Sequence, residues 1–118
     1  MLTKAQILAA DDLESVTVPV PEWGGDVLIS MMSGSARDEY EQSLFKFQAD
    51  GTAKPDYSNS RAKLLAVCLI DENGNRLFTA KEIEILGKKN SKVLDKLYAV
   101  ADQLNAVSAA GIKDQAKN

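Results

Sequence analysis

The most constraining feature of this sequence is an unbroken apolar run, Leu64–Ile70, that stops abruptly at a turn-forming segment. A helix without a polar face must be buried nearly all round, so this run belongs at the centre of the fold. The next segment, Asp71–Asn75, reads D-E-N-G-N, and Gly74 is free to take the positive φ of a tight turn. Arg76–Phe78 is predicted to return as a short strand. The pattern indicates a buried helix, a tight turn and a second helix.

The same turn imitates a calcium-binding loop. Oxygen-bearing side chains occupy loop positions one, three, five, nine and twelve, namely Asp71, Asn73, Asn75, Thr79 and Glu82. An EF-hand loop also needs glycine at position six, where this chain has the cation Arg76. We therefore favour the interpretation in which Thr79 and Glu82 form a capping box that opens a new helix. A divalent-ion module using Asp71–Glu82 stays open as an alternative function.

Length and charge limit the classes of protein. The chain of 118 residues is predicted to form one domain over residues 1–108, followed by a flexible tail at Ala109–Asn118. Its net charge of −3 provides no basic surface for a nucleic-acid partner. The sequence has no apolar stretch of transmembrane length, and Met1–Ala10 is too polar for a signal peptide. We expect a cytoplasmic protein with no membrane partner.

Composition also argues against catalysis. The chain has no histidine and a single cysteine, Cys68, which lies inside the apolar run. These counts exclude intrachain disulfides, zinc sites of the usual kind and any nucleophile–histidine pair. Cys68 is expected to be a buried, inert thiol. We predict a protein that is not an enzyme, uses no cofactor and has no catalytic or metal-binding residues.

The N-terminal third is predicted to form a helix and a hairpin. Thr3 and Gln6 form a capping box for a helix that runs to about Leu13, with Ile7 and Leu8 on its inner face. Two strands follow, Ser15–Val20 and Val27–Met32, separated by a glycine-rich turn. Alternation places Val16, Val18 and Val20 on one side of the first strand, which is expected to be half-buried. Trp23, at the tip, is expected to cover the core, with partner binding as the alternative.

The middle of the chain is predicted to be a helix followed by a loop. Ser35 is the expected cap of the helix, which presents one apolar face. That face consists of Ala36, Tyr40, Leu44 and Phe47. Ala49–Asn59 has no periodicity and is predicted to be a long loop. Such a loop either becomes ordered on a partner or is simply a tolerated insertion.

Three helices follow in the C-terminal half. Ser60 is the expected cap of the helix that contains the apolar run, and Gly87 is expected to terminate the short helix from Ala80 as its C′ residue. The last helix begins near Asn90 or Ser91. Its apolar seam is spaced four, three, four and three residues apart: Val93, Leu97, Val100, Leu104 and Val107. Two heptads are too few for a coiled coil, so we expect this seam to dock into the core, with self-association as the alternative.

The predicted fold class is therefore mainly α within an α+β architecture. It consists of about five helices, one N-terminal β-hairpin, and a short strand after the Asp71–Asn75 turn.

Several segments, taken in order, resemble the tail assembly chaperones of long, non-contractile-tailed bacteriophages. They are M-L-T-K-A-Q-I-L-A-A-D-D at the start, V-P-E-W-G-G-D-V at Val20–Val27, S-G-S-A-R-D-E-Y-E at Ser33–Glu41, and R-A-K-L-L-A-V-C-L-I-D-E-N-G-N-R-L-F-T at Arg61–Thr79. The resemblance implies a protein that binds the tape measure protein, helps to recruit tail tube subunits and is absent from the mature virion. A structural tail or head–tail component that stays in the virion is the alternative.

A chaperone of this kind needs adaptable or apolar surface to meet its client. The candidate partner-binding residues are Trp23, Met31, Met32, Val93, Leu97, Val100 and Leu104. Packing within the protein is the competing interpretation of each. A client much longer than the chaperone also favours weak, repeatable contacts between copies, so we predict a weak homo-oligomer with ring-like or open head-to-tail assembly.

Overall fold

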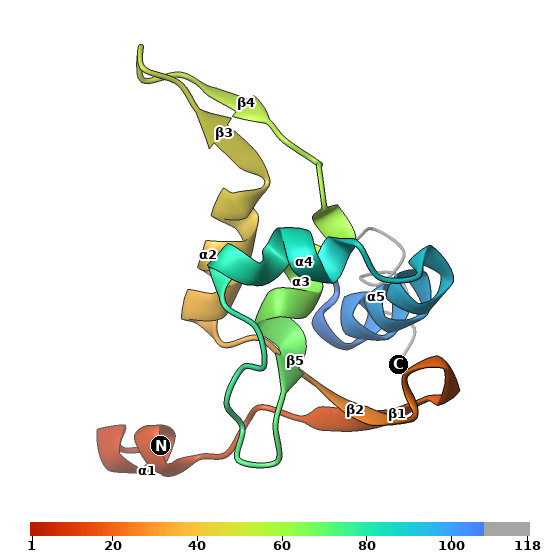
Figure 1. Ribbon diagram of the computed structural model, residues 1–118. Coiled ribbons are helices and arrows are strands. Elements are labelled where there is room, and N and C mark those ends of the chain that lie inside the picture. Colours follow the sequence, from red (N-terminus) through yellow and green to blue (C-terminus); the bar gives the residue numbers. More distant parts are fainter. Residues whose placement is uncertain (108–118) are drawn as a thin grey trace.

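A three-stranded antiparallel sheet and a group of helices form the body of the molecule, from which a helix and a two-stranded ribbon project (Figure 1). The computed structural model describes residues 1–107. Its elements are α1 (Lys4–Ala9), β1 (Ser15–Val20), η1 (Pro21–Trp23), β2 (Gly25–Ser30), α2 (Gly34–Ser43), β3 (Phe45–Phe47), β4 (Ala53–Pro55), α3 (Ser60–Cys68), β5 (Leu69–Ile70), η2 (Ala80–Glu82), α4 (Ile83–Gly87) and α5 (Ser91–Asn105). The predicted class, mainly α within α+β, is confirmed. The expected tail Ala109–Asn118 lies outside the described residues.

The apolar run forms the centre of the core, as predicted, but it is not all helix. Helix α3 ends at Cys68, and Leu69–Ile70 continues as strand β5, which pairs with Leu28 and Ile29 of β2. A buried helix and a buried strand can have the same apolar composition. Here Leu69 and Ile70, the last two residues of the run, form a strand because they pair with the free edge of β2. The short strand predicted after the turn appears as an isolated bridge between Arg76 and Ile70.

The helices pack around α3. Helix α3 contacts α2, α4, α5 and strand β2. The largest side chains with almost no exposed surface are Ile29, Leu64, Leu65, Leu69, Leu86 and Leu97. Burying a side chain of this size contributes roughly 1.5–3 kcal/mol, so the packing of the sheet and the helices around α3 stabilises the body.

The predicted hairpin of β1 and β2 is present. Its register pairs Val16 with Ile29 and Val18 with Val27. Val18 and Val20 are buried as expected, whereas Val16, at 36% exposed, is more open than predicted because it lies near the outer end of the edge strand. Strand β2 ends at Ser30 rather than Met32.

Helix α1 departs from its prediction. The capping box is present, with Gln6 N–H donating to Thr3 Oγ1 at 3.2 Å and Thr3 N–H donating to Gln6 Oε1 at 2.9 Å. The helix ends at Ala9, not near Leu13, and no residue of it is buried. Ile7 and Leu8 are 57% and 75% exposed, so they do not form an inner face. Their spacing identified an apolar side correctly, but α1 lies away from the other helices (Figure 1).

The second helix is capped by Ser33, not Ser35. The Ser33 hydroxyl accepts a hydrogen bond from Ala36 N–H at 3.1 Å. Helix α2 ends at Ser43, so Phe47 lies beyond it and is 68% exposed rather than on its buried face. Within the predicted loop Ala49–Asn59, only Ala53–Pro55 departs from the prediction, because it forms strand β4 and pairs antiparallel with β3; the other residues are turns or irregular. The tripeptide Phe-Lys-Phe alternates with the period of a strand, which the helical interpretation of this region overlooked.

Of the three terminal positions predicted for helices in the C-terminal half, one is confirmed, and the last helix begins where expected. Glu82 accepts hydrogen bonds from Thr79 as the predicted capping box requires, and Asn90 caps α5 by accepting from Lys92 N–H at 2.8 Å. Helix α3 is preceded by Asn59 at a φ of 53°, not capped by Ser60, which is its first residue. Gly87 is the last residue of α4 rather than its C′ residue. A side chain on Gly87 would collide with the Asn59 amide, so close approach explains this glycine.

Candidate partner-binding surfaces

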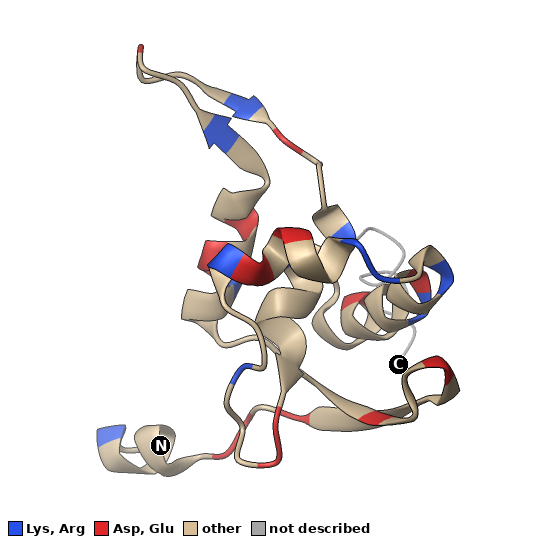
Figure 2. Ribbon diagram, viewed as in Figure 1, with Lys and Arg blue, Asp and Glu red and all other residues tan. Residues whose placement is uncertain are grey.

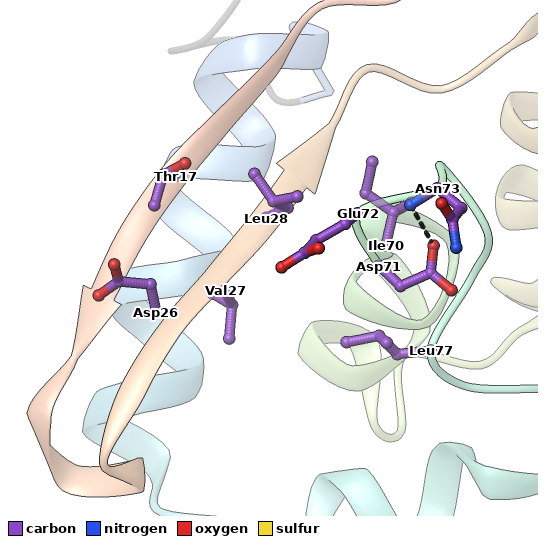
Figure 3. Close-up of a pocket in the computed structure, with 9 residues that line it drawn as sticks. All are labelled: Thr17, Asp26, Val27, Leu28, Ile70, Asp71, Glu72, Asn73 and Leu77. Carbon is purple, nitrogen blue, oxygen red and sulfur yellow. Dashed lines mark hydrogen bonds between the residues drawn. The ribbon is translucent and has the colours of Figure 1, made fainter.

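A groove lies between β2 and the Asp71–Asn75 turn (Figure 3). It has a volume of about 670 Å³. Its lining residues are Thr17, Asp26, Val27, Leu28, Ile70, Asp71, Glu72, Asn73 and Leu77. Apolar side chains therefore form much of the groove, and three carboxylates stand around it. We call it the acidic groove.

The turn holds its shape through its own side chain. The Asp71 carboxylate accepts hydrogen bonds from Asn73 N–H at 2.8 Å and Asn75 N–H at 3.0 Å, and Gly74 adopts a φ of 85°. This is the tight turn that the sequence predicts. Glu72 extends from the turn towards β2, across the groove (Figure 3). Residues 1–107 contain no group of three or more His, Cys, Asp or Glu side chains placed to hold a metal ion.

A second, shallower groove brings together three of the predicted partner-binding residues. Met31, Met32 and Leu104 line it with the start of α2. The side chain of Asn105 fixes this wall, because its Oδ1 accepts a hydrogen bond from Met32 N–H at 2.7 Å. Both methionines follow β2 rather than packing within the strand, and both are half-buried.

Two of the other four predicted partner-binding residues lie in the core. Val93 and Leu97 are 1% and 0% exposed, so the seam of α5 docks into the body, as favoured from its length. Val100 and Leu104 are half-buried at its margin. Trp23 is also half-buried and packs against the core from the tip of the hairpin. Of the seven candidates, two are therefore fully buried and the other five are half-buried: Trp23, Met31, Met32, Val100 and Leu104.

Two exposed apolar surfaces were missed among the candidates. One is α1 with its flanking residues, where Leu2, Ile7 and Leu8 are all more than half exposed. The other is the β3–β4 ribbon, where Phe45 is 46% and Phe47 is 68% exposed. The alternation of Phe45 and Phe47 around Lys46 was the available signal for the ribbon. For α1 the sequence predicts an apolar side with Ile7 and Leu8, but no local pattern indicates that this side is left uncovered by the rest of the protein.

The buried thiol and the surface ion pairs give no sign of a reactive centre. Burial raises the pKa of the Cys68 thiol to about 12, so almost no thiolate forms at neutral pH. A hydrogen bond from Arg76 lowers the pKa of the Glu39 carboxyl, and the two side chains lie 2.8 Å apart. Arg76 thus pairs with α2 rather than with the oxygen atoms of its own turn.

These features define a class of protein: a small α+β protein with exposed apolar and charged surfaces. The family model described as phage tail assembly chaperone matches residues 3–118, and the chain belongs to that family. This finding confirms the resemblance seen in the sequence.

One solved structure supports the fold. The tail assembly chaperone of bacteriophage HK97 superposes with a TM-score of 0.59 at 23% identity. The alignment covers 85% of this chain and 94% of that chain. At this identity the likeness establishes a shared fold. Comparison with curated proteins finds no match. Within residues 1–107, no helix is long and apolar enough to cross a membrane.

Proposed function

We propose that this protein binds the tape measure protein of its phage and helps to recruit tail tube subunits to it during tail assembly. The family match over residues 3–118 carries this proposal. In this role the protein acts in the cytoplasm of the host cell, uses no cofactor and leaves before the virion is complete. Its task is binding rather than catalysis.

Exposed apolar surface supports the proposal. A protein that keeps a helical client in solution must offer apolar surface to that client's helices. The Met31–Met32 groove meets this need, because methionine side chains adapt to irregular partners. Leu104 extends the same wall from α5. Three of the seven predicted partner-binding residues thus line one open groove: Met31, Met32 and Leu104.

Co-expression tests the proposal. The tape measure protein from the same gene cluster is expressed alone and together with this chain, and its soluble fraction is measured. We expect solubility only in the presence of the chain, and Met31→Ala should reduce it. Ala99→Ser, on an exposed position of α5, is the matched control. A tape measure protein that stays insoluble with the wild-type chain would contradict the proposed role.

Mass spectrometry of purified virions separates a chaperone from a structural component. A chaperone that departs before completion should be missing from the particle, while tail tube subunits from the same sample serve as the internal standard. Detection of this chain in stoichiometric amounts would support the structural alternative instead.

We also propose that copies of the protein associate weakly with one another. A client far longer than this chain requires many copies, and weak repeated contacts let that number follow the length of the client.

A further inference from the structure

The β3–β4 ribbon has two chemically different faces. Its register pairs Phe45 with Pro55, Lys46 with Lys54, and Phe47 with Ala53. Successive residues of a strand point to opposite faces, so one face is wholly apolar and the other carries two lysines directly opposite each other. Every residue of both strands is exposed.

This ribbon lacks the cover that a stable two-stranded sheet needs. Among the described strands, β3 and β4 pair only with each other. An isolated two-stranded hairpin is marginally stable at best, and like charges directly opposite one another are destabilising. A surface that covered the two phenylalanines and brought carboxylates to the lysines would relieve both problems.

The acidic groove has these properties. Its apolar lining includes Leu28, Ile70 and Leu77, and the carboxylates of Asp26 and Glu72 stand beside them. None of its nine lining residues is Lys or Arg. Figure 2 shows the contrast, with lysines on the ribbon strands and acidic residues on β2 and the turn.

The groove also offers a free sheet edge. Strand β1 pairs with all six residues of β2, whereas β5 pairs only with Leu28 and Ile29. On the groove side, Gly25–Val27 of β2 therefore has no paired strand among the described residues. An entering strand could continue the sheet there, where main-chain hydrogen bonds supply affinity and side chains supply specificity.

We propose that the ribbon of one copy docks in the acidic groove of the next copy. The phenylalanines meet the apolar lining, and Lys46 and Lys54 meet Asp26 and Glu72. The ribbon lies at the opposite end of the molecule from β2 and β5, which border the groove, so a ribbon is remote from the groove of its own chain (Figure 1). Such a contact joins different surfaces and repeats head to tail, forming an open chain or a ring. This inference rests on the proposed self-association and names its interface.

Charge reversal tests the pairing. Sedimentation velocity is measured for K46E/K54E, for D26K/E72K and for an equimolar mixture of the two. Each variant alone juxtaposes like charges and should associate at least about tenfold more weakly than the wild type, whereas the mixture should recover association. Recovery is expected because the two variants complement each other. The acidic ribbon of K46E/K54E fits the basic groove of D26K/E72K, and the basic ribbon of D26K/E72K fits the acidic groove of K46E/K54E.

Controls separate the interface from the fold. K88E/K89E reverses two exposed lysines outside both surfaces and should associate like the wild type. Circular dichroism must show the wild-type spectrum for each variant. F45A/F47A supplies an independent test, because removing exposed phenylalanines should weaken association without unfolding the chain.

Three outcomes would overturn the proposed interface: a wild-type chain that is strictly monomeric at the highest concentration, unchanged association of K46E/K54E, or a mixture that fails to recover. The solubility of the co-expressed tape measure protein is scored separately for the same variants. Loss of association with retained client solubility would leave the chaperone role intact.

Discussion

Helix α5 and the β3–β4 ribbon both carry an apolar face, but only one of these faces is covered within the chain. The α5 face lies against α3, and Leu97 at its centre is fully buried. The ribbon face extends beyond the body, and Phe47 on it is 68% exposed. Periodicity identifies the apolar side of an element, while its neighbours decide whether that side is buried in the fold or left exposed.

The largest predicted effect is on the covered face. Leu97→Ala should lower the free energy of unfolding by about 3 kcal/mol, because it removes a fully buried side chain and leaves a cavity between α5 and α3. Urea denaturation followed by circular dichroism measures this loss. Ala99→Ser on the exposed side of α5 is the control and should be nearly neutral. A loss below about 1 kcal/mol would show that the seam is not a core element.

Trp23 should show an intermediate effect. The side chain packs against the core but is only half-buried, so Trp23→Ala should cost about 2 kcal/mol, less than the roughly 3 kcal/mol or more of a fully buried tryptophan. Denaturant unfolding of the variant tests this value. Unchanged stability would place the indole on the surface and strengthen its candidacy as a partner contact.

The pair of Glu39 and Arg76 should contribute less. The folded-state pKa of Glu39 is depressed below its ordinary 4.5, so its stabilisation is present above pH 4.5 and is lost as the pH falls through the folded value. Both side chains are exposed, so Glu39→Gln should cost only about 0.5 kcal/mol at neutral pH. Unfolding measured at pH 7 and well below pH 4.5 should show this difference shrinking in acid. A difference that grows on acidification would contradict the assignment.

The smallest effect is expected on the ribbon. Phe47→Ala should change the free energy of unfolding of the dilute protein by less than about 0.5 kcal/mol, because its side chain gains little burial within one copy. Thermal unfolding at low and high concentration measures this change, with Leu97→Ala as the contrast. A large loss in the dilute protein would remove the distinction between the covered and uncovered faces.

Local patterns predicted the elements whose cause is local. The Asp71–Asn75 turn, the cap at Thr79 and the start of the last helix near Asn90 depend on neighbours within a few residues, and each is present. Their prediction succeeded because turn and cap hydrogen bonds close over two to four residues. The predicted hairpin joins two strands that adjoin in the sequence, and it is also present. The family resemblance likewise needed only the order of segments.

Two of the misses have a different cause. Leu69 and Ile70 become a strand because the edge of β2 lies beside them, and a Cβ on Gly87 would meet the side chain of Asn59, which belongs to a distant part of the chain. In both cases the neighbour is too far along the sequence for a local pattern to show. The strand at Phe45–Phe47 pairs with β4 close by, and the alternation of its own residues was the signal available to predict it.

The apolar run, the Asp71–Asn75 turn, the seam of α5 and the family resemblance can be read from the sequence alone. They follow from side-chain chemistry and short-range backbone geometry. The cover over α5, the exposure of α1 and the ribbon, and the position of Asp26 and Glu72 beside one apolar groove follow only from the folded structure. Which apolar faces remain open depends on packing between elements distant in the chain, and long-range packing sets the position of every surface through which this chaperone can meet a partner.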